Sequence, residues 1–160
     1  MSGETCIELD LLGSPECWAT VRELRQRVKR LMASYDEDVQ EAAVMTASEL
    51  LENALKYGVA AEGTSTTRFE MRLDARALTI ATTNVVDSDA DGVALRERIE
   101  RIMREPDKEA LYVQRLQDFM DTSTVAGGLG LYRVAFEGAF ELQCATGNKM
   151  VVVTARRAVP

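Results

Sequence analysis

The 160-residue chain has the length of a single domain, and its 46% hydrophobic and 28% charged residues are typical of a globular protein. It carries 19 Lys and Arg residues against 26 Asp and Glu residues, and this net charge of −7 argues against a nucleic-acid-binding surface. The sequence contains no histidine, which excludes Ser-His-Asp and Cys-His triads, metal sites with histidine ligands and phosphohistidine on this chain.

The cysteines and the N-terminus predict a cytoplasmic protein. Three widely spaced cysteines, Cys6, Cys17 and Cys144, suit free thiols in a reducing compartment better than a disulfide framework or a zinc site. No apolar run approaches the roughly 20 residues of a membrane span, and the N-terminal sequence MSGETCIELD lacks the basic and apolar regions of a signal peptide. We therefore expect no contact with a membrane.

The first half of the chain predicts a strand, two helices and a β-hairpin. Residues 6–12 alternate as in a strand, and residues 14–33 predict a helix that begins with a Ser N-cap followed by Pro. A second helix, with acidic residues in its first turn and a glycine C-cap, is predicted over 36–58. Residues 68–85 are two strand-like runs joined by a polar turn at 74–76, which is the pattern of a hairpin.

The second half of the chain predicts an acidic loop, three helices and a closing pair of strands. The loop has several carboxylates, but a calcium loop that starts at Asp87 would place Arg98 where its bidentate Glu is required, so we discount calcium. In chain order, the loop is predicted at 87–92, the helices at 93–103, 108–120 and 129–137, and the strands at 139–145 and 150–156.

The order of these elements predicts an α+β fold in which residues 1–160 form one domain. A strand, two helices and a hairpin are followed by three helices and two strands. We expect a two-layer α/β sandwich whose mixed, mostly antiparallel sheet carries helices on one face.

The second predicted helix places three polar side chains beside its apolar stripe. At about 100° per residue, the stripe falls within an arc of about 80°, and Glu49, Asn53 and Lys56 share an arc of about 60° on its flank. We expect these three side chains at the edge of the core, where a pocket between the helices and the sheet would open. Glu and Asn four residues apart also occur on many solvated helices. The stripe consists of Val39, Ala43, Ala47, Leu50, Ala54 and Tyr57.

This flank suits phosphoryl transfer. The amide oxygen of Asn53 can be one ligand of magnesium, which prefers oxygen and keeps several waters. Glu49, one turn earlier, can accept a proton from an attacking hydroxyl or water. Lys56, and Arg133 further along the chain, are candidates for phosphate contacts, although a solvated helical charge explains each equally well.

A glycine-rich segment runs straight into the last predicted helix. Gly127 and Gly128 would let backbone amides approach an anion, and Gly130 would make room at the start of the helix. The helix N-terminus adds favourable charge for phosphate. A flexible linker with glycine caps is the alternative interpretation.

In this order and on these elements, the two motifs resemble those of the GHKL ATPase superfamily of gyrase, heat-shock chaperone, histidine-kinase and anti-sigma-factor domains. Residues 49–53 look like its N-box, and GGLGL at 127–131 looks like its second glycine box. The resemblance covers nearly the whole chain and implies the GHKL fold, with ATP and Mg²⁺ as cofactors. It implies that Glu49 is the general base, that Asn53 is the magnesium ligand, and that the phosphate loop and lid hinge are formed by Gly127, Gly128, Leu129, Gly130 and Leu131.

The sequence departs from the superfamily at its first glycine box. The family follows the second hairpin strand with Asp-x-Gly-x-Gly, whose Asp accepts a hydrogen bond from the adenine amine. Here Asn84 stands where that Asp is expected, and both glycines are missing. The Asn84 oxygen can still accept from the amine, but losing the charge is expected to weaken binding by on the order of 1 kcal/mol.

The strand that ends in Asn84, the long helical stretch after it and GGLGL together look like the SiaB-type subgroup of bacterial partner-switching kinases, which are akin to anti-sigma-factor kinases. This resemblance implies transfer of the ATP γ-phosphate to a Ser or Thr of a small regulatory protein. The absence of histidine agrees, because a sensor histidine kinase carries its own phospho-accepting histidine. Two alternatives stay open: a degenerate, non-catalytic module that binds and sequesters a regulatory partner, and an ATPase without a protein substrate.

Two further expectations concern movement and assembly. Residues 87–126 are expected to form a lid that orders only with nucleotide, because its ends are polar and glycine-flanked. A homodimer formed through the first strand and helix is left open, as are the identities of the partner and its phospho-acceptor.

Overall fold

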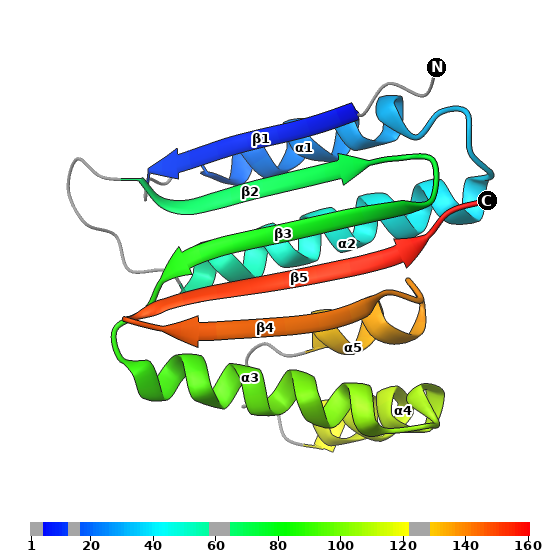
Figure 1. Ribbon diagram of the computed structural model, residues 1–160. Helices are drawn as coiled ribbons and strands as arrows, with labels where there is room; N and C mark the ends of the chain where they lie inside the picture. Colours follow the sequence, from blue (N-terminus) through cyan, green and yellow to red (C-terminus); the bar gives the residue numbers. More distant parts are fainter. Residues whose placement is uncertain (1–4, 13–16, 58–64, 122–128) are drawn as a thin grey trace.

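The computed structural model describes residues 5–12, 17–57, 65–121 and 129–160, which form one sheet and a layer of helices (Figure 1). All ten predicted strands and helices are present. In chain order they are β1 (Thr5–Leu12), α1 (Cys17–Leu31), α2 (Glu37–Tyr57), β2 (Ser65–Leu73), β3 (Ala77–Val85), α3 (Asp89–Arg104), α4 (Lys108–Asp121), α5 (Leu129–Phe136), β4 (Glu141–Gly147) and β5 (Met150–Ala158).

The strands are arranged in the order β1-β2-β3-β5-β4. Each of the four described neighbour pairs is antiparallel. The predicted α+β class is therefore confirmed, whereas the expectation of a mixed sheet is wrong for the strands described. Two hairpins explain the difference: β2 and β3 are joined by the predicted turn, and β4 and β5 by a turn with positive φ at Asn148 and Lys149. Antiparallel strands are the ones that such short turns can join.

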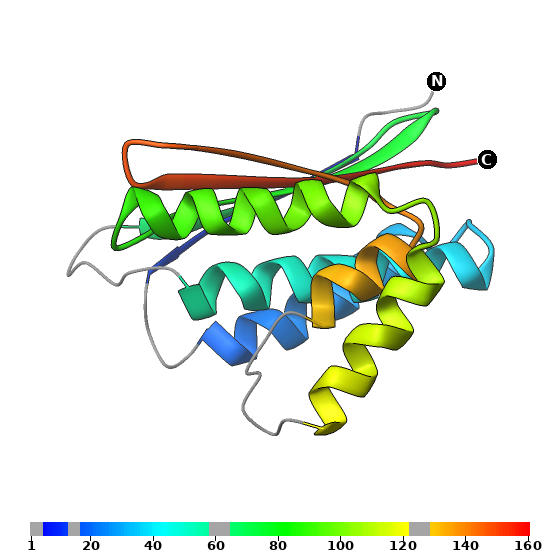
Figure 2. The same cartoon turned by 90° about the horizontal axis from the view of Figure 1, so that it is seen from below.

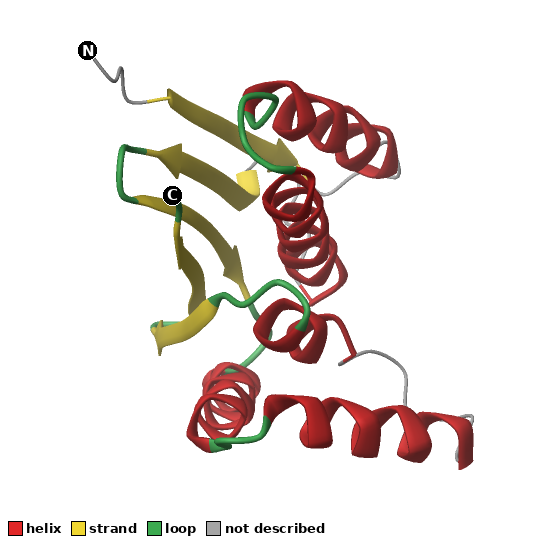
Figure 3. Ribbon diagram, turned by 90° about the vertical axis from the view of Figure 1, so that its right-hand side faces the viewer, coloured by secondary structure: helices red, strands yellow, loops and turns green. Residues whose placement is uncertain are grey.

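Helices α1, α2 and α5 cover one face of the sheet (Figure 3). The alternation of side chains along the strands explains which face they cover. In β2, Phe69 and Met71 are fully buried toward the helices, whereas Arg68 is exposed and forms ion pairs with Glu8 of β1 and Glu70. One face of the sheet is therefore core, and the other is a charged surface.

The apolar stripe predicted for α2 is buried. This places α2 at the centre of the helical layer, between α1 and α5 (Figure 3). The side chain of Tyr57 lies outside the described residues, and the other members of the stripe are all in the core: Val39, Ala43, Ala47, Leu50 and Ala54. Because burial of the stripe sets the orientation of α2 about its own axis, it also sets the direction in which the flank with Glu49 and Asn53 faces.

Helix α3 runs along β4 at the edge of the sheet (Figures 1 and 2). Ile99 and Ile102 are each only 1% exposed and belong to the core. A Cβ on Gly92 would collide with Thr146 Oγ1 of β4, so the glycine at this position allows α3 to pack closely against β4. The apolar side chains of α3 thus complete the core, and the expectation that residues 87–126 order only with nucleotide stays a prediction.

The N-terminus of α3 is held by two contacts. Ser88 is its N-cap, and the Ser88 hydroxyl accepts from the backbone N–H of Asp91 at 3.4 Å. Asp89 Oδ1 accepts from the backbone N–H of Lys149, in the β4–β5 turn, at 2.7 Å. The expectation of a loop over 87–92 is thus wrong from Asp89 onward, because the Ser88 cap satisfies a backbone donor of the first helical turn and Asp89 ties that turn to the β4–β5 turn.

The structure also bears on the predictions about the cysteines and about membrane-spanning segments. Cys6 and Cys144 are free thiols, as predicted, and the side chain of Cys17 lies outside the described residues. Across 5–12, 17–57, 65–121 and 129–160, no helix combines the length and the apolar character that crossing a membrane requires.

Candidate functional site

A hollow of about 510 Å³ opens between α2, the sheet and α3. This volume lies within the range of small-molecule sites. Its walls come from segments far apart in the sequence: α2, strands β3 and β5, the N-terminal half of α3 and the start of α5. The pocket expected beside the flank of α2 is therefore present.

Two polar side chains of β3 form the floor of this hollow. Thr82 and Asn84 alternate with the outward-facing Thr83, so they point toward the helices, and they are only 1% and 5% exposed. The Asn84 side chain forms no hydrogen bond with another residue of the described part of the chain. Among the described residues, the fully buried side-chain polar atoms that lack a partner belong to threonines and not to Asn84. The Asn84 amide is therefore accessible from the hollow and can bind a polar group of a ligand.

The wall formed by α2 carries two of the predicted residues. Asn53 and Lys56 both line the hollow, Asn53 partly buried and Lys56 exposed at its mouth. They are three residues apart and so share one side of the helix. An amide oxygen and an ammonium group thus face the same space as Asn84.

The opposite wall contains residues that the sequence did not single out. Asp91 and Arg98 of α3 line the hollow, as does Asp87 just before the helix. An N-cap serine followed by acidic residues in the first turn is a recognisable helix start. This signal could have placed Asp91 and Arg98 on one helix, but it does not show that this helix lies opposite α2. Leu95, between them, supplies apolar surface to the same wall.

Glu49 lies one turn from Asn53 but faces α5 and is not among the residues that line the hollow. Its Oε1 is 3.4 Å from Arg133 Nη1, and Arg133 Nε donates to Glu137 Oε2 at 3.2 Å. Gly130 packs directly on the Glu49 carboxylate, where a Cβ would collide with Oε2. Glu49 is therefore held between the first two turns of α5 and its own helix.

The environment of Glu49 raises the pKa of its carboxyl group above the ordinary value. Partial burial is the main cause, and the neighbouring carboxylate of Glu52 acts in the same direction. The positive charges of Arg133 and Arg25 oppose the shift. A carboxylate that is partly desolvated, yet kept in place by an arginine, is suited to accept a proton.

The glycine-rich motif is only partly described. Gly127 and Gly128 lie outside the described residues, so their predicted phosphate-binding role stays a prediction. Leu129 and Gly130 are the first two residues of α5, and Leu131 is buried and lines the hollow. The N-terminus of α5 therefore lies next to both the hollow and Glu49.

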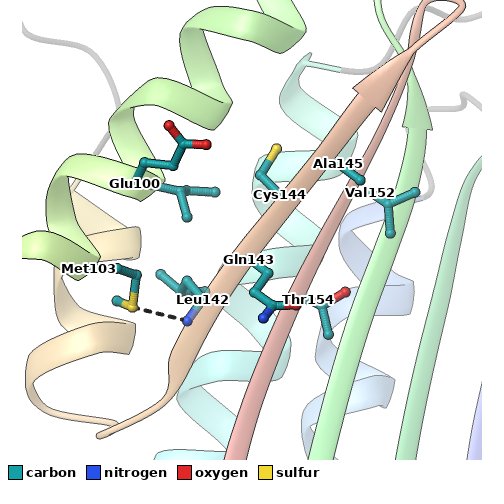
Figure 4. Close-up of a pocket in the computed structure, with 9 residues that line it drawn as sticks. Glu100, Met103, Leu142, Gln143, Cys144, Ala145, Val152 and Thr154 are labelled. Atoms are coloured by element: carbon teal, nitrogen blue, oxygen red, sulfur yellow. Dashed lines mark hydrogen bonds between the residues drawn. The ribbon is translucent and has the colours of Figure 1, made fainter.

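A second hollow of about 340 Å³ lies between α3 and β4 (Figure 4). Of the nine residues that line it, only Glu100 is charged. Met103 Sδ accepts from the backbone N–H of Leu142 across this gap at 3.3 Å. Its other polar side chains, Gln143, Cys144 and Thr154, are uncharged, and we do not assign it a ligand.

The metal chemistry open to the larger hollow is limited. Within the described ranges, no three His, Cys, Asp or Glu side chains are grouped closely enough to hold a metal ion. Magnesium does not need such a group, because it keeps several waters and takes oxygens from substrate phosphates. The Asn53 amide oxygen fits as a protein ligand of that kind.

Comparisons with known proteins do not identify a family for this chain. No protein-family model matches the sequence, and no curated protein matches it either. Its functional assignment therefore depends on the residues and the geometry described above.

Proposed function

We propose that this chain is an ATP- and magnesium-dependent protein serine/threonine kinase of a bacterial partner-switching system, built on the GHKL fold. One observation carries the proposal: Asn53 and Lys56 of α2 line the same hollow as the buried Asn84 of β3. Asn53 belongs to the segment that resembles the N-box, which implies metal binding, and Asn84 stands where the superfamily has the adenine-binding Asp of its first glycine box.

The hollow has the composition that a nucleotide requires. Leu95, Leu131 and Val153 supply apolar surface for a flat base, and Asn84 supplies a hydrogen-bonding group beneath it. Lys56 and Arg98 bring positive charge from opposite walls, where phosphate groups would be favoured. Magnesium would neutralise charge on the phosphates, with Asn53 among its ligands.

In this proposal Glu49 is the general base. It accepts the proton of a Ser or Thr hydroxyl on the partner while the hydroxyl oxygen attacks the γ-phosphorus and the bond to the β–γ bridging oxygen breaks. The products are a phosphoester on the partner and ADP. The raised pKa of Glu49 supports this role, since a base works best when its pKa approaches the working pH.

Calorimetry with ATP, with and without Mg²⁺, tests the binding step. We expect magnesium-dependent binding to the unchanged chain, loss of binding in Asn53→Ala and retained binding in Glu49→Ala. Glu41→Ala is the matched control, because Glu41 is exposed on the same helix and outside the hollow. The absence of magnesium-dependent binding at millimolar ATP would refute the proposal.

Phosphotransfer tests the catalytic step. The protein is incubated with γ-labelled ATP and each small regulatory protein encoded beside it, and the labelled protein is identified. Glu49→Ala is expected to reduce labelling by about 10²- to 10⁴-fold, while Glu41→Ala leaves it unchanged.

The ion pair between Glu49 and Arg133 favours one alternative, a non-catalytic module that sequesters its partner. In that case Glu49 would be a structural residue rather than a base. Partner binding would then be the same with and without ATP, and the same in Glu49→Ala. Release of the partner by ATP would exclude this alternative.

A further inference from the structure

Asn84, at the floor of the larger hollow, is only 5% exposed as a residue, and no described residue holds its amide in one orientation. It lies on β3 opposite Val151 of β5, and its side chain forms no hydrogen bond with another described residue. Thr82, its neighbour on the same face, is also neutral. The floor therefore presents uncharged polar groups, while the acidic residues of the hollow, Asp87 and Asp91, are exposed.

An amide can pair with two kinds of ligand edge, whereas a carboxylate can pair with one. The amide offers an accepting oxygen and a donating NH₂ group, and a rotation of about 180° exchanges them. Because no described residue holds the Asn84 amide in one orientation, either group can face the hollow. An ionised carboxylate at this position would only accept hydrogen bonds.

Purine bases differ at the atom that such a floor would contact. A 6-amino purine presents a donor at its C6 edge and a 6-oxo purine presents an acceptor. The oxygen of Asn84 matches the first, and its NH₂ group matches the second. Ala54, Leu95 and Leu131 contribute apolar surface to the walls, which suits the faces of either base equally.

We propose that this hollow binds purine nucleoside triphosphates with little discrimination between 6-amino and 6-oxo bases, and that Asn84 is the residue that removes the discrimination. This inference rests on the proposed function, because it concerns the same site, and it names the class of phosphate donor. The transfer reaction is unchanged: the γ-phosphoryl group moves to the partner hydroxyl and a purine nucleoside diphosphate leaves.

Calorimetry in the presence of Mg²⁺ with ATP, ITP and GTP tests the inference. ITP carries a 6-oxo base without the 2-amino group of GTP, so it differs from ATP only at C6 and at N1, which is an acceptor in ATP and an N–H donor in ITP. We expect ATP and ITP to bind the unchanged chain with dissociation constants within about tenfold of each other. In Asn84→Asp, ITP is expected to weaken relative to ATP by about 5- to 150-fold, the discrimination of one well-paired base contact.

Two variants keep the result interpretable. Thr83→Ala changes the adjacent residue on the opposite face of β3, outside the hollow, and is expected to leave the ratio of ATP to ITP affinity unchanged. Asn84→Ala removes both hydrogen-bonding groups, and we expect it to weaken ATP and ITP by similar factors. Circular dichroism confirms that each variant is folded.

The outcomes separate this inference from the proposed function. If the unchanged chain binds ATP more than a hundredfold more tightly than ITP, or if Asn84→Asp folds and leaves the ratio unchanged, the inference is overturned while ATP binding stands. If none of the three nucleotides binds at millimolar concentration, the proposed function and the inference both fail.

Discussion

Replacement of Ile102 by Ala tests whether α3 belongs to the folded core or moves as a lid. Ile102 is 1% exposed and belongs to the core cluster that joins α3 to the sheet and the other helices. Truncation of such a residue to Ala costs about 2–5 kcal/mol, because apolar contacts are lost and a cavity remains. In a chain of this length each kcal/mol lowers Tm by about 2–4 °C, so we expect Tm to fall by about 4–20 °C.

The measurement is equilibrium unfolding in urea, followed by circular dichroism, for Ile102→Ala and for Arg101→Ala. Arg101 is the adjacent exposed residue of the same helix, and its removal is expected to change the unfolding free energy by less than about 0.5 kcal/mol. A loss of under about 1 kcal/mol in Ile102→Ala would refute the packing argument. It would mean that α3 detaches from the sheet at little cost, as a lid would.

Two further predictions concern Glu49. A Cβ at Gly130 would collide with the flexible end of the Glu49 side chain. Gly130→Ala is therefore expected to fold but, at saturating ATP, to transfer phosphate more slowly than the unchanged chain. Unchanged transfer would mean that the position of this carboxylate is not critical. The raised pKa of Glu49 means that the folded protein binds this proton more tightly than the unfolded chain does. Its contribution to the unfolding free energy therefore falls as pH rises from below the unfolded pKa to above the folded one. Glu49→Gln removes this dependence. In urea unfolding, we expect the unfolding free energy of the variant to rise relative to that of the unchanged chain between pH 4 and pH 7. A difference that does not change with pH would contradict the raised pKa of Glu49.

The elements that could be predicted from the sequence are those with a strong local pattern. The stripe of α2 repeats at helical spacing, and its described members are buried as expected. The hairpin of β2 and β3 could also be predicted from the sequence, because its turn is stabilised locally. Asp74 accepts hydrogen bonds from the backbone N–H groups of Arg76 and Ala77 within the turn itself. Such contacts depend on residues close together in the chain.

The start of α3 illustrates what a local pattern conceals. A run of Asp residues with a glycine is typical of a loop, yet here Ser88 caps the helix and Asp89 accepts from Lys149, which is 60 residues further along the chain. The pairing of β1 with β2 and of β3 with β5 depends in the same way on contacts between distant segments. The expected pocket at the edge of α2 was predictable, but its second wall was not.

The pair formed by Glu49 and Arg133 could not be predicted, because 84 residues separate them and each resembles a solvated helical charge. In the structure Arg133 lies between the carboxylates of Glu49 and Glu137, so its charge is already matched within α2 and α5. A phosphate that recruited Arg133 would have to compete with these carboxylates. Because Arg133 lowers the pKa of Glu49, its departure would raise that pKa further and make Glu49 a stronger base. Phosphate binding at α5 and proton acceptance by Glu49 would then be coupled through one arginine.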